Sequence, residues 1–145
     1  INSGRYVNDS MGRYIGKKVV KKIISQGKNI LGAHVLVMGM TFKENVSDIR
    51  NSKVADIINE FKDFGAEVDV MDPFASPLEV LQEYGIRLVE RPGKKYDAVV
   101  VAVAHTTYLK LDESYFMSIT NEHAVLADVK GVYRGSIHQM IYWSL

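Results

Sequence analysis

Short apolar runs that do not alternate with polar residues recur along the chain, and segments with helical spacing separate them. The clearest runs are 97–104 (DAVVVAVA) and 34–40 (HVLVMGM). A strand that is apolar on both faces is buried on both faces, which is typical of parallel sheets covered by helices. Because strands and helices alternate, we expect an α/β fold with a doubly wound, Rossmann-like, mostly parallel sheet.

The same patterns give the expected elements. The spacing predicts a long helix over 3–27, which precedes the sheet. Further helices are expected over 52–64, 77–84 and 112–119, strands over 34–40, 67–71, 86–89, 97–104 and 124–129, and a terminal segment over 136–143. Ser52 is the expected N-cap of its helix, and Gly65 and Gly85 are expected to end theirs.

The long helix has an apolar stripe with a four-residue repeat, formed by Val7, Met11, Ile15, Val19 and Ile23. A helix of this length would span about 37 Å, which is long for a small domain. We therefore expect it to join two domains or to lie in a dimer interface. Gly12 and Gly16 lie four residues apart, a spacing that could let another helix approach closely.

Composition excludes several kinds of site. The chain has 145 residues and no cysteine, so it fits one domain, or one domain plus an appendage, without a disulfide, a thiolate zinc site or a cysteine nucleophile. No apolar run is long enough to predict a membrane span. The absence of cysteine is compatible with a reducing compartment, and we expect a cytoplasmic location. Because Ile1 comes first, we expect a processed protein or a piece of a longer one.

Charge is distributed unevenly along the chain. Residues 1–30 contain seven basic residues and one acidic residue, whereas the remainder contains 11 basic and 16 acidic residues. A basic head on an acidic body could bind nucleic acid, bind an anionic ligand or pair with an acidic subunit. A solvated helix face would give the same pattern.

The loop after the first strand, 39–52, carries the most informative polar residues. Lys43 and Arg50 precede a helix N-terminus, and two cations in that position make a phosphate site physically sensible. Phe42 could pack against a base or a sugar, and Asp48 could hold Arg50 or the loop itself. An ordinary polar surface loop remains the alternative.

A dinucleotide site of the usual kind is not expected in this domain. It would need G-x-G-x-x-G between the first strand and its helix, but Met40, Thr41 and Phe42 follow Gly39. Asp72 lies where a Rossmann acid would contact a ribose. Without the glycines, we expect Asp72 to cap the turn before Pro73, and we expect no NAD to bind here.

Three further residues lie at strand ends on the predicted ligand edge. His105 could be a general base or a hydrogen-bonded loop histidine, and Tyr108 is open to the same two interpretations. Lys130 could be a third cation or a solvated lysine. The remaining histidines have no ligand spacing, so no metal site is expected.

The segment Gly39-x-x-Phe42-Lys43-x-x-x-x-Asp48-x-Arg50-x-Ser52 resembles the start of the C-terminal, UDP-binding domain of the UDP-glucose/GDP-mannose dehydrogenase family. The preceding Arg5-x-x-Asn8-Asp9-x-Met11 resembles the end of that family's central helix. Asp72-Pro73 and the segments 103–105 and 126–130 follow in the expected order. Within the family, the chain is most similar to UDP-N-acetylhexosamine 6-dehydrogenases of bacterial polysaccharide synthesis.

The resemblance implies an NAD-dependent, two-step oxidation of a sugar C6 alcohol to a carboxylate. In the family, an N-terminal domain binds NAD and a cysteine forms the covalent intermediate, and this chain has neither. Residues 1–30 would be the end of a connecting and dimerisation helix, and residues 31–145 the domain that binds the UDP-sugar. We therefore expect a homodimer in which this part alone is inactive and binds no NAD.

The resemblance also implies roles for individual residues. Phe42, Lys43 and Lys130 would lie at the nucleotide-sugar, with Lys43 nearest the reacting sugar as the catalytic candidate. Asp48 and Arg50 would shape and charge the loop. Lys130 stands near the usual place of an arginine, and a lysine keeps the charge but loses the planar fork of a guanidinium.

An alternative function is a non-catalytic dimerisation or interaction module, with the basic helix as its functional surface. A third possibility, nucleic-acid binding through that helix, would predict a steep loss of binding with salt. Our expectation is the UDP-sugar domain, with neither nucleic acid nor membrane as a partner.

Overall fold

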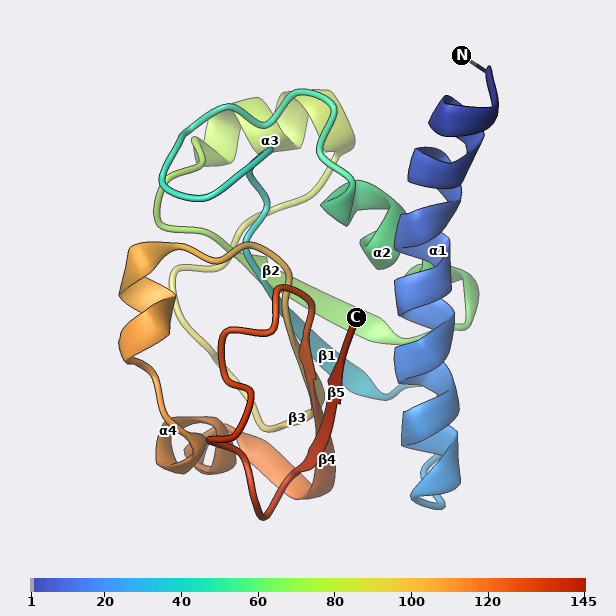
Figure 1. The fold of residues 1–145 in the computed structure, drawn as a ribbon, viewed down its shortest axis with the longest axis vertical. Coiled ribbons are helices and arrows are strands. Elements are labelled where there is room, and N and C mark those ends of the chain that lie inside the picture. Colours follow the sequence, from blue (N-terminus) through green and yellow to red (C-terminus); the bar gives the residue numbers. More distant parts are fainter. Residues whose placement is uncertain (1) are drawn as a thin grey trace.

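The sheet has five parallel strands in the order β2-β1-β3-β4-β5. In the computed structural model, which describes the backbone of residues 2–145 and the side chains from residue 10 onward, the strands are β1 (His34–Met38), β2 (Glu67–Met71), β3 (Tyr96–Val101), β4 (Thr120–Asp128) and β5 (Ile141–Ser144). The helices are α1 (Asn2–Ser25), α2 (Val54–Asp63), α3 (Pro77–Tyr84), the 3₁₀ helix η1 (Thr106–Lys110) and α4 (Glu113–Ser118). Figure 1 shows this arrangement. It confirms the predicted α/β class, with a parallel sheet that follows a long N-terminal helix in the sequence.

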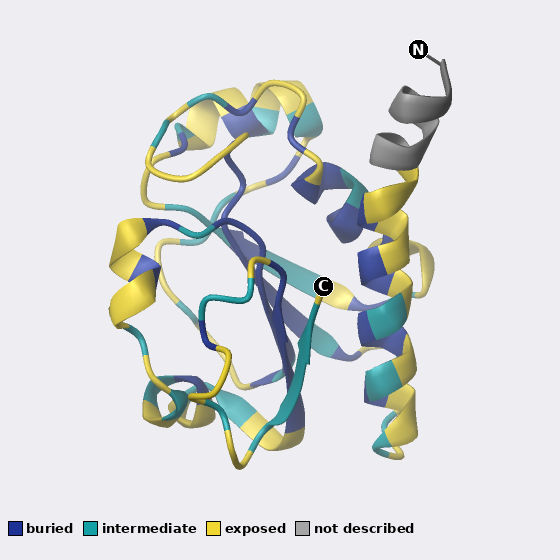
Figure 2. Ribbon diagram, viewed as in Figure 1, coloured by how far each residue is buried: buried dark blue, intermediate teal, exposed yellow. Residues whose placement is uncertain are grey.

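Helices and loops cover both faces of the sheet, as the apolar strands predicted. Alternate residues of one strand point to opposite faces, so Val35 and Val37 of β1 join the core under α1, α2 and α3. Leu36 and Met38 join the core under η1, α4 and the 129–140 loop. Figure 2 shows the central strands buried and the outer surfaces of the helices exposed.

Helix α1 is a layer of this fold, because it packs on α2 and on the sheet. Ile15, Val19 and Ile23 are buried in the core, which confirms the predicted stripe over these positions. Met11 is 37% exposed, and Val7 lies outside the residues whose side chains are described. The close helix approach predicted at Gly12 and Gly16 is confirmed, since both glycines lie against α2 of the same chain.

Most predicted boundaries agree with the structure to within a few residues. Gly85 adopts the left-handed conformation as the C-cap of α3, and Gly65 follows the C-cap of α2 with a φ of +87°. Ser52 stands one residue before the N-cap, and its hydroxyl accepts the Val54 N–H at 3.3 Å. The N-cap prediction at Ser52 was therefore wrong by one residue.

Two segments differ more. Residues 86–89 form no strand, and only a single bridge joins Leu88 to Val70 of β2. The terminal segment contains β5, which pairs in parallel with β4 through Ile141–Ser144. Its four residues are all half-buried, so neither a buried run nor a clear alternation marks them as a strand in the sequence.

Candidate functional site

The order of the strands places the ligand edge between β1 and β3. β1 pairs with β2 on one side and with β3 on the other, so the strand order reverses at β1: β2 is added to one side of it and β3, β4 and β5 to the other. In open parallel sheets, ligands bind at the carboxyl ends of the strands beside such a reversal. The segments that leave β1 and β3 are therefore the first candidates for a site.

The two segments meet closely at Gly39. Its φ is +104°, and a Cβ there would lie 2.7 Å from the Cβ of Val103 and 2.9 Å from the Val103 backbone nitrogen. Only glycine satisfies both demands. Glycine is therefore required at position 39 because the first loop passes close to the segment after β3. A phosphate-binding glycine motif is not needed to explain this glycine.

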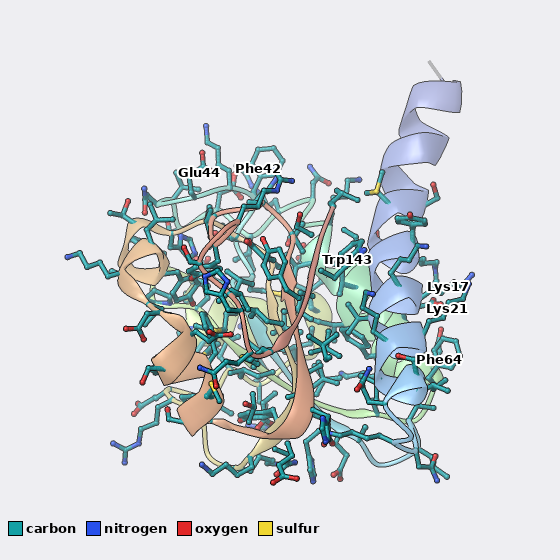
Figure 3. All side chains as sticks on the ribbon, turned by 60° about the horizontal axis from the view of Figure 1, so that its bottom comes forward. Lys17, Lys21, Phe42, Glu44, Phe64 and Trp143 are labelled. Carbon is teal, nitrogen blue, oxygen red and sulfur yellow. The ribbon has the colours of Figure 1, made fainter. Side chains whose placement is uncertain are left out.

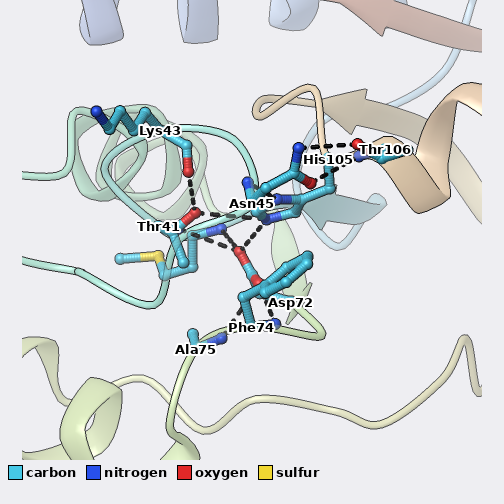
Figure 4. A network of polar contacts seen from close by, with 9 residues as sticks. Thr41, Lys43, Asn45, Asp72, Phe74, Ala75, His105 and Thr106 are labelled. Atoms are coloured by element: carbon cyan, nitrogen blue, oxygen red, sulfur yellow. Dashed lines mark hydrogen bonds and ion pairs between the residues drawn. The ribbon is translucent and has the colours of Figure 1, made fainter.

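Asp72 fixes the start of the first loop. Its Oδ2 accepts the backbone N–H groups of Met40 at 2.6 Å and Thr41 at 3.1 Å. Its Oδ1 accepts those of Phe74 at 2.7 Å and Ala75 at 3.2 Å. The expected cap of the turn at Pro73 is confirmed, and the same carboxylate also holds the segment that follows β1. Figure 4 shows it at the centre of these contacts.

His105 joins the same network from the end of β3. Its ring is fully buried and lies 2.9 Å from Asp72 Oδ2 through Nε2. Its Nδ1 accepts the backbone N–H of Asn45 at 2.9 Å, so the proton of the neutral ring is on Nε2, which donates to Asp72. Of the two interpretations of His105, the geometry gives the hydrogen-bonded loop histidine.

The carboxylate of Asp72 is held ionised by its donors. Burial pushes the pKa of Asp72 upward, but the hydrogen bonds from Met40, His105 and Phe74 outweigh burial and bring the pKa below the ordinary value of 3.8. A buried carboxylate with several N–H donors favours its charged form. The edge of the sheet therefore keeps a fixed negative charge that is already paired and is not available to a ligand.

A cleft of about 220 Å³ opens beside this network. It gathers residues from α1, the first loop, the start of α2 and the end of β4. Its lining includes Met11, Gly12, Thr41, Phe42, Lys43, Glu44, Lys53, Val54, Val103 and Lys130. The structure thus brings together three of the predicted site residues: the adjacent Phe42 and Lys43, and Lys130, which is distant from them in the sequence.

The cleft has the chemistry of an anion site with an aromatic rim. Three lysines line it, and Phe42 is 55% exposed beside them. Figure 3 shows Phe42 and Glu44 projecting at one end of the molecule. Lysines bind phosphate as point charges, and an exposed ring offers a face to a base or a sugar.

Asp48 and Arg50 lie elsewhere. The carboxylate of Asp48 accepts the backbone N–H of Arg50 at 2.9 Å and its guanidinium at 3.1 Å. Both residues line a separate groove with Glu79, Gln82 and Glu83. The guanidinium of Arg50 lowers the pKa of Asp48 through this hydrogen bond. The pair shapes its own loop and does not line the cleft that holds Lys43.

Sequence reasoning missed several lining residues. Lys53 stands at the N-cap of α2 and faces the cleft, and a cation beside a helix start on the ligand edge was a signal that could have found it. Met11 and Gly12 enter the cleft from α1. The sequence pattern marked them only for helix packing, because their place in the cleft depends on how α1 packs against α2.

A larger cavity lies on the other side of the same edge. It has a volume of about 520 Å³, and its walls include Met38, Met71, Leu88 and Tyr108. Of the residues that the sequence analysis considered for a site, Asp72 and Tyr108 line it. Its size alone does not make it the site, since its walls are mostly apolar and lack the cations of the smaller cleft.

Two kinds of feature are absent from the residues that the structure describes. Within them, no group of three or more His, Asp or Glu side chains could hold a metal ion. None of their helices has the length and hydropathy that crossing a bilayer requires.

Comparison with known proteins gives consistent matches. The chain is 38% identical over 133 residues to the UDP-N-acetyl-D-glucosamine 6-dehydrogenase of Salmonella typhi and 39% identical over 131 residues to that of Pseudomonas aeruginosa. These matches cover 91% and 90% of the chain but 31% of each relative. The chain therefore spans about a third of the length of these curated relatives.

Solved structures extend the likeness to the fold. The UDP-N-acetyl-mannosamine dehydrogenase of Staphylococcus aureus superposes with a TM-score of 0.76 at 25% identity, over 97% of this chain and 31% of that one. Residues 36–135 match the profile of the UDP binding domain of a single family. This stretch runs from the middle of β1 to beyond β4 and contains most of the residues that line the cleft, and on this match the chain belongs to the UDP-glucose/GDP-mannose dehydrogenase family.

Proposed function

We propose that the chain is the C-terminal, UDP-sugar-binding part of an NAD-dependent nucleotide-sugar 6-dehydrogenase that serves polysaccharide precursor synthesis in the cytoplasm. The observation that carries the proposal is the cleft at the carboxyl ends of β1, β3 and β4, with Lys43, Lys53 and Lys130 in its walls. Three cations beside an exposed aromatic ring suit a nucleoside diphosphate. The named relatives support the substrate class, since they are dehydrogenases of UDP-N-acetylhexosamines.

In the proposed site, Lys43 and Lys130 bind the diphosphate and Phe42 packs on the sugar or the base. Lys43 is the residue nearest the reacting sugar. Asp48 and Arg50 hold the loop through their mutual hydrogen bonds. The network of Asp72 and His105 fixes the backbone from which Phe42 and Lys43 project.

The proposal divides the chain at residue 30. Residues 1–30 form the end of a connecting helix through which two subunits pair, and residues 31–145 form the UDP-sugar domain. NAD and the cysteine nucleophile belong to an N-terminal part of the enzyme outside this sequence. That part supplies the hydride acceptor, and the present residues bind and orient the sugar nucleotide.

The experiment is a calorimetric titration of the 145-residue chain with UDP, with the UDP-N-acetylhexosamines and with NAD. We expect measurable binding of UDP and its sugars, little binding of NAD and no turnover. Binding of NAD that is tighter than binding of UDP would overturn the proposal.

The alternative, a basic helix that acts as the functional surface, has less support. Arg13 donates to Glu60 of α2 at 3.0 Å, and Lys17 lies 3.9 Å from the same carboxylate. Part of the positive charge of residues 1–30 is therefore paired with an acidic residue of the same chain. A UDP titration without binding, together with salt-sensitive binding of nucleic acid, would favour this alternative.

A further inference from the structure

One buried histidine ties three segments together at the ligand edge. His105 follows β3, Asp72 follows β2, and Asn45 lies in the loop after β1. The ring donates from Nε2 to Asp72 and accepts the Asn45 N–H at Nδ1. The segment between these two contacts, residues 40–45, carries Phe42 and Lys43.

The side chain of Asn45 makes two further hydrogen bonds to Thr106, the residue after His105. Its amide donates to the hydroxyl of Thr106 at 2.8 Å and its carbonyl accepts the Thr106 N–H at 2.9 Å. Its backbone has a φ of +61°, a left-handed conformation that asparagine adopts more readily than most non-glycine residues. The hydrogen bonds to His105 and Thr106 after β3 hold the loop in this turn.

The start of the loop is held by the same ring through Asp72. The carboxylate accepts the N–H groups of Met40 and Thr41, and the His105 Nε2 proton is its third donor on the same oxygen. Thr41 in turn donates its hydroxyl to the Lys43 carbonyl at 2.8 Å. Figure 4 shows these contacts meeting at Asp72, Thr41 and His105.

We infer that His105 and Asp72 form a positioning pair that holds loop 40–45 in its ligand-binding shape, with His105 in the neutral Nε2–H form. His105 is buried and is not among the residues that line the cleft, so it acts through the loop and does not contact the ligand. This inference rests on the proposed function, because the ligand is the UDP-sugar. A loop that populates its binding shape only part of the time weakens apparent affinity by that fraction.

Two substitutions separate the halves of the pair. His105→Asn places a carbonyl oxygen near the position of Nδ1 and can still accept the Asn45 N–H. His105→Gln places an amide near the position of Nε2 and can still donate to Asp72, but it leaves the Asn45 N–H without its acceptor. We expect UDP to bind His105→Gln about tenfold more weakly than the wild type, since one buried hydrogen bond is lost.

The test combines titration of UDP with NMR. In the wild type, the ring-nitrogen shifts of His105 should show protonated Nε2 and unprotonated Nδ1, and UDP should slow amide exchange at Asn45 relative to Leu126 of the core. His105→Asn should bind UDP more weakly than the wild type, because Asp72 loses a donor. It should still bind more tightly than His105→Gln, because Asp72 Oδ2 keeps the N–H groups of Met40 and Thr41. Folded His105→Gln with wild-type affinity would overturn the inference, as would the opposite tautomer.

The remaining outcomes are also decisive. If neither variant folds, the wild-type spectra decide. An amide exchange rate at Asn45 that does not change when UDP is added overturns the inference. If the wild type binds no UDP, the proposed function fails. In that case the tautomer and the exchange at Asn45 in the two variants still show whether the pair holds the loop.

Discussion

Gly16 of α1 lies so close to α2 that a Cβ on it would stand 2.7 Å from the Cβ of Glu60. Gly12, one turn earlier, has the same relation to Asp56, at 2.6 Å. The carboxylate of Glu60 is buried and accepts the guanidinium of Arg13. The two glycines thus let α1 and α2 pack closely together. The Arg13–Glu60 ion pair then links the two helices beside this contact.

This contact predicts that Gly16→Ala lowers the free energy of unfolding. Alanine favours a helix by about 1 kcal/mol over glycine, but the added methyl group overpacks a contact that involves the side chain of Glu60. We expect a net loss of about 1–3 kcal/mol, measured by urea denaturation. Gly93→Ala is the control, because nothing lies within 4 Å of a Cβ there. A Gly16→Ala variant as stable as the wild type would contradict the prediction.

The fold could be predicted because its strongest signals are local. The runs at β1 and β3 are apolar on both faces, and α3 has both its expected proline start and its glycine end. β5 could not be predicted in the same way. Its residues are half-buried, and they form a strand only because β4 offers an unpaired edge that is distant in sequence.

The site could be predicted only in part, for the same reason. Lys43 and Lys130 follow strands, so a parallel sheet puts them at one edge. Their meeting in one cleft depends on the strand order and on α1. Arg50 follows Lys43 closely in sequence but lies elsewhere, because the loop between them turns at Asn45, which has a positive φ. No residue pattern gives the direction of such a turn.

Lys43→Ala should weaken UDP binding by about tenfold or more, since a charge-assisted contact to a phosphate is lost. The side chain is exposed, so stability should change by less than about 0.5 kcal/mol. Lys62→Ala is the matched control, because it removes an exposed lysine of α2 that does not line the cleft. If both variants lose affinity equally, the effect is one of overall charge, and Lys43 does not bind the ligand. Titration and thermal denaturation measure the two quantities.

The lowered pKa of Asp72 predicts that the free energy of unfolding depends on pH in the acid range. Its pKa lies below 3.8 in the folded chain because of its N–H donors, despite its burial. A carboxylate with a lowered folded pKa contributes stability above its unfolded pKa, and the contribution is lost as pH falls through the folded pKa. We therefore expect the free energy of unfolding to decrease below about pH 3.8.

Asp72→Asn isolates this contribution from those of other carboxylates. An asparagine turns one acceptor into an NH₂ group that faces backbone donors, so we expect a loss of about 1–3 kcal/mol at pH 7. The difference between wild type and variant should shrink as pH falls below 3.8, because the wild type then loses its carboxylate. Urea denaturation of both proteins, from pH 7 down to the lowest pH at which they still fold, measures this difference in the free energy of unfolding. A difference that stays constant with pH would show that the charge of Asp72 does not matter.

The exposed side of α1 predicts how two copies pair, if the proposed dimer forms through this helix. Tyr14 and Ile24 are 47% and 50% exposed. Their helical spacing puts them on the same side of α1 as Lys17 and Lys21, and Figure 3 shows these two lysines on the outer side of the helix. Ile24→Asp should lower the mass measured by light scattering and leave the fold intact. Leu31→Asp is the control, because Leu31 is 70% exposed but lies beyond α1. Ile15→Asp should instead unfold the chain, since Ile15 belongs to the core. A wild-type mass that Ile24→Asp does not change would exclude this side of α1 as the interface.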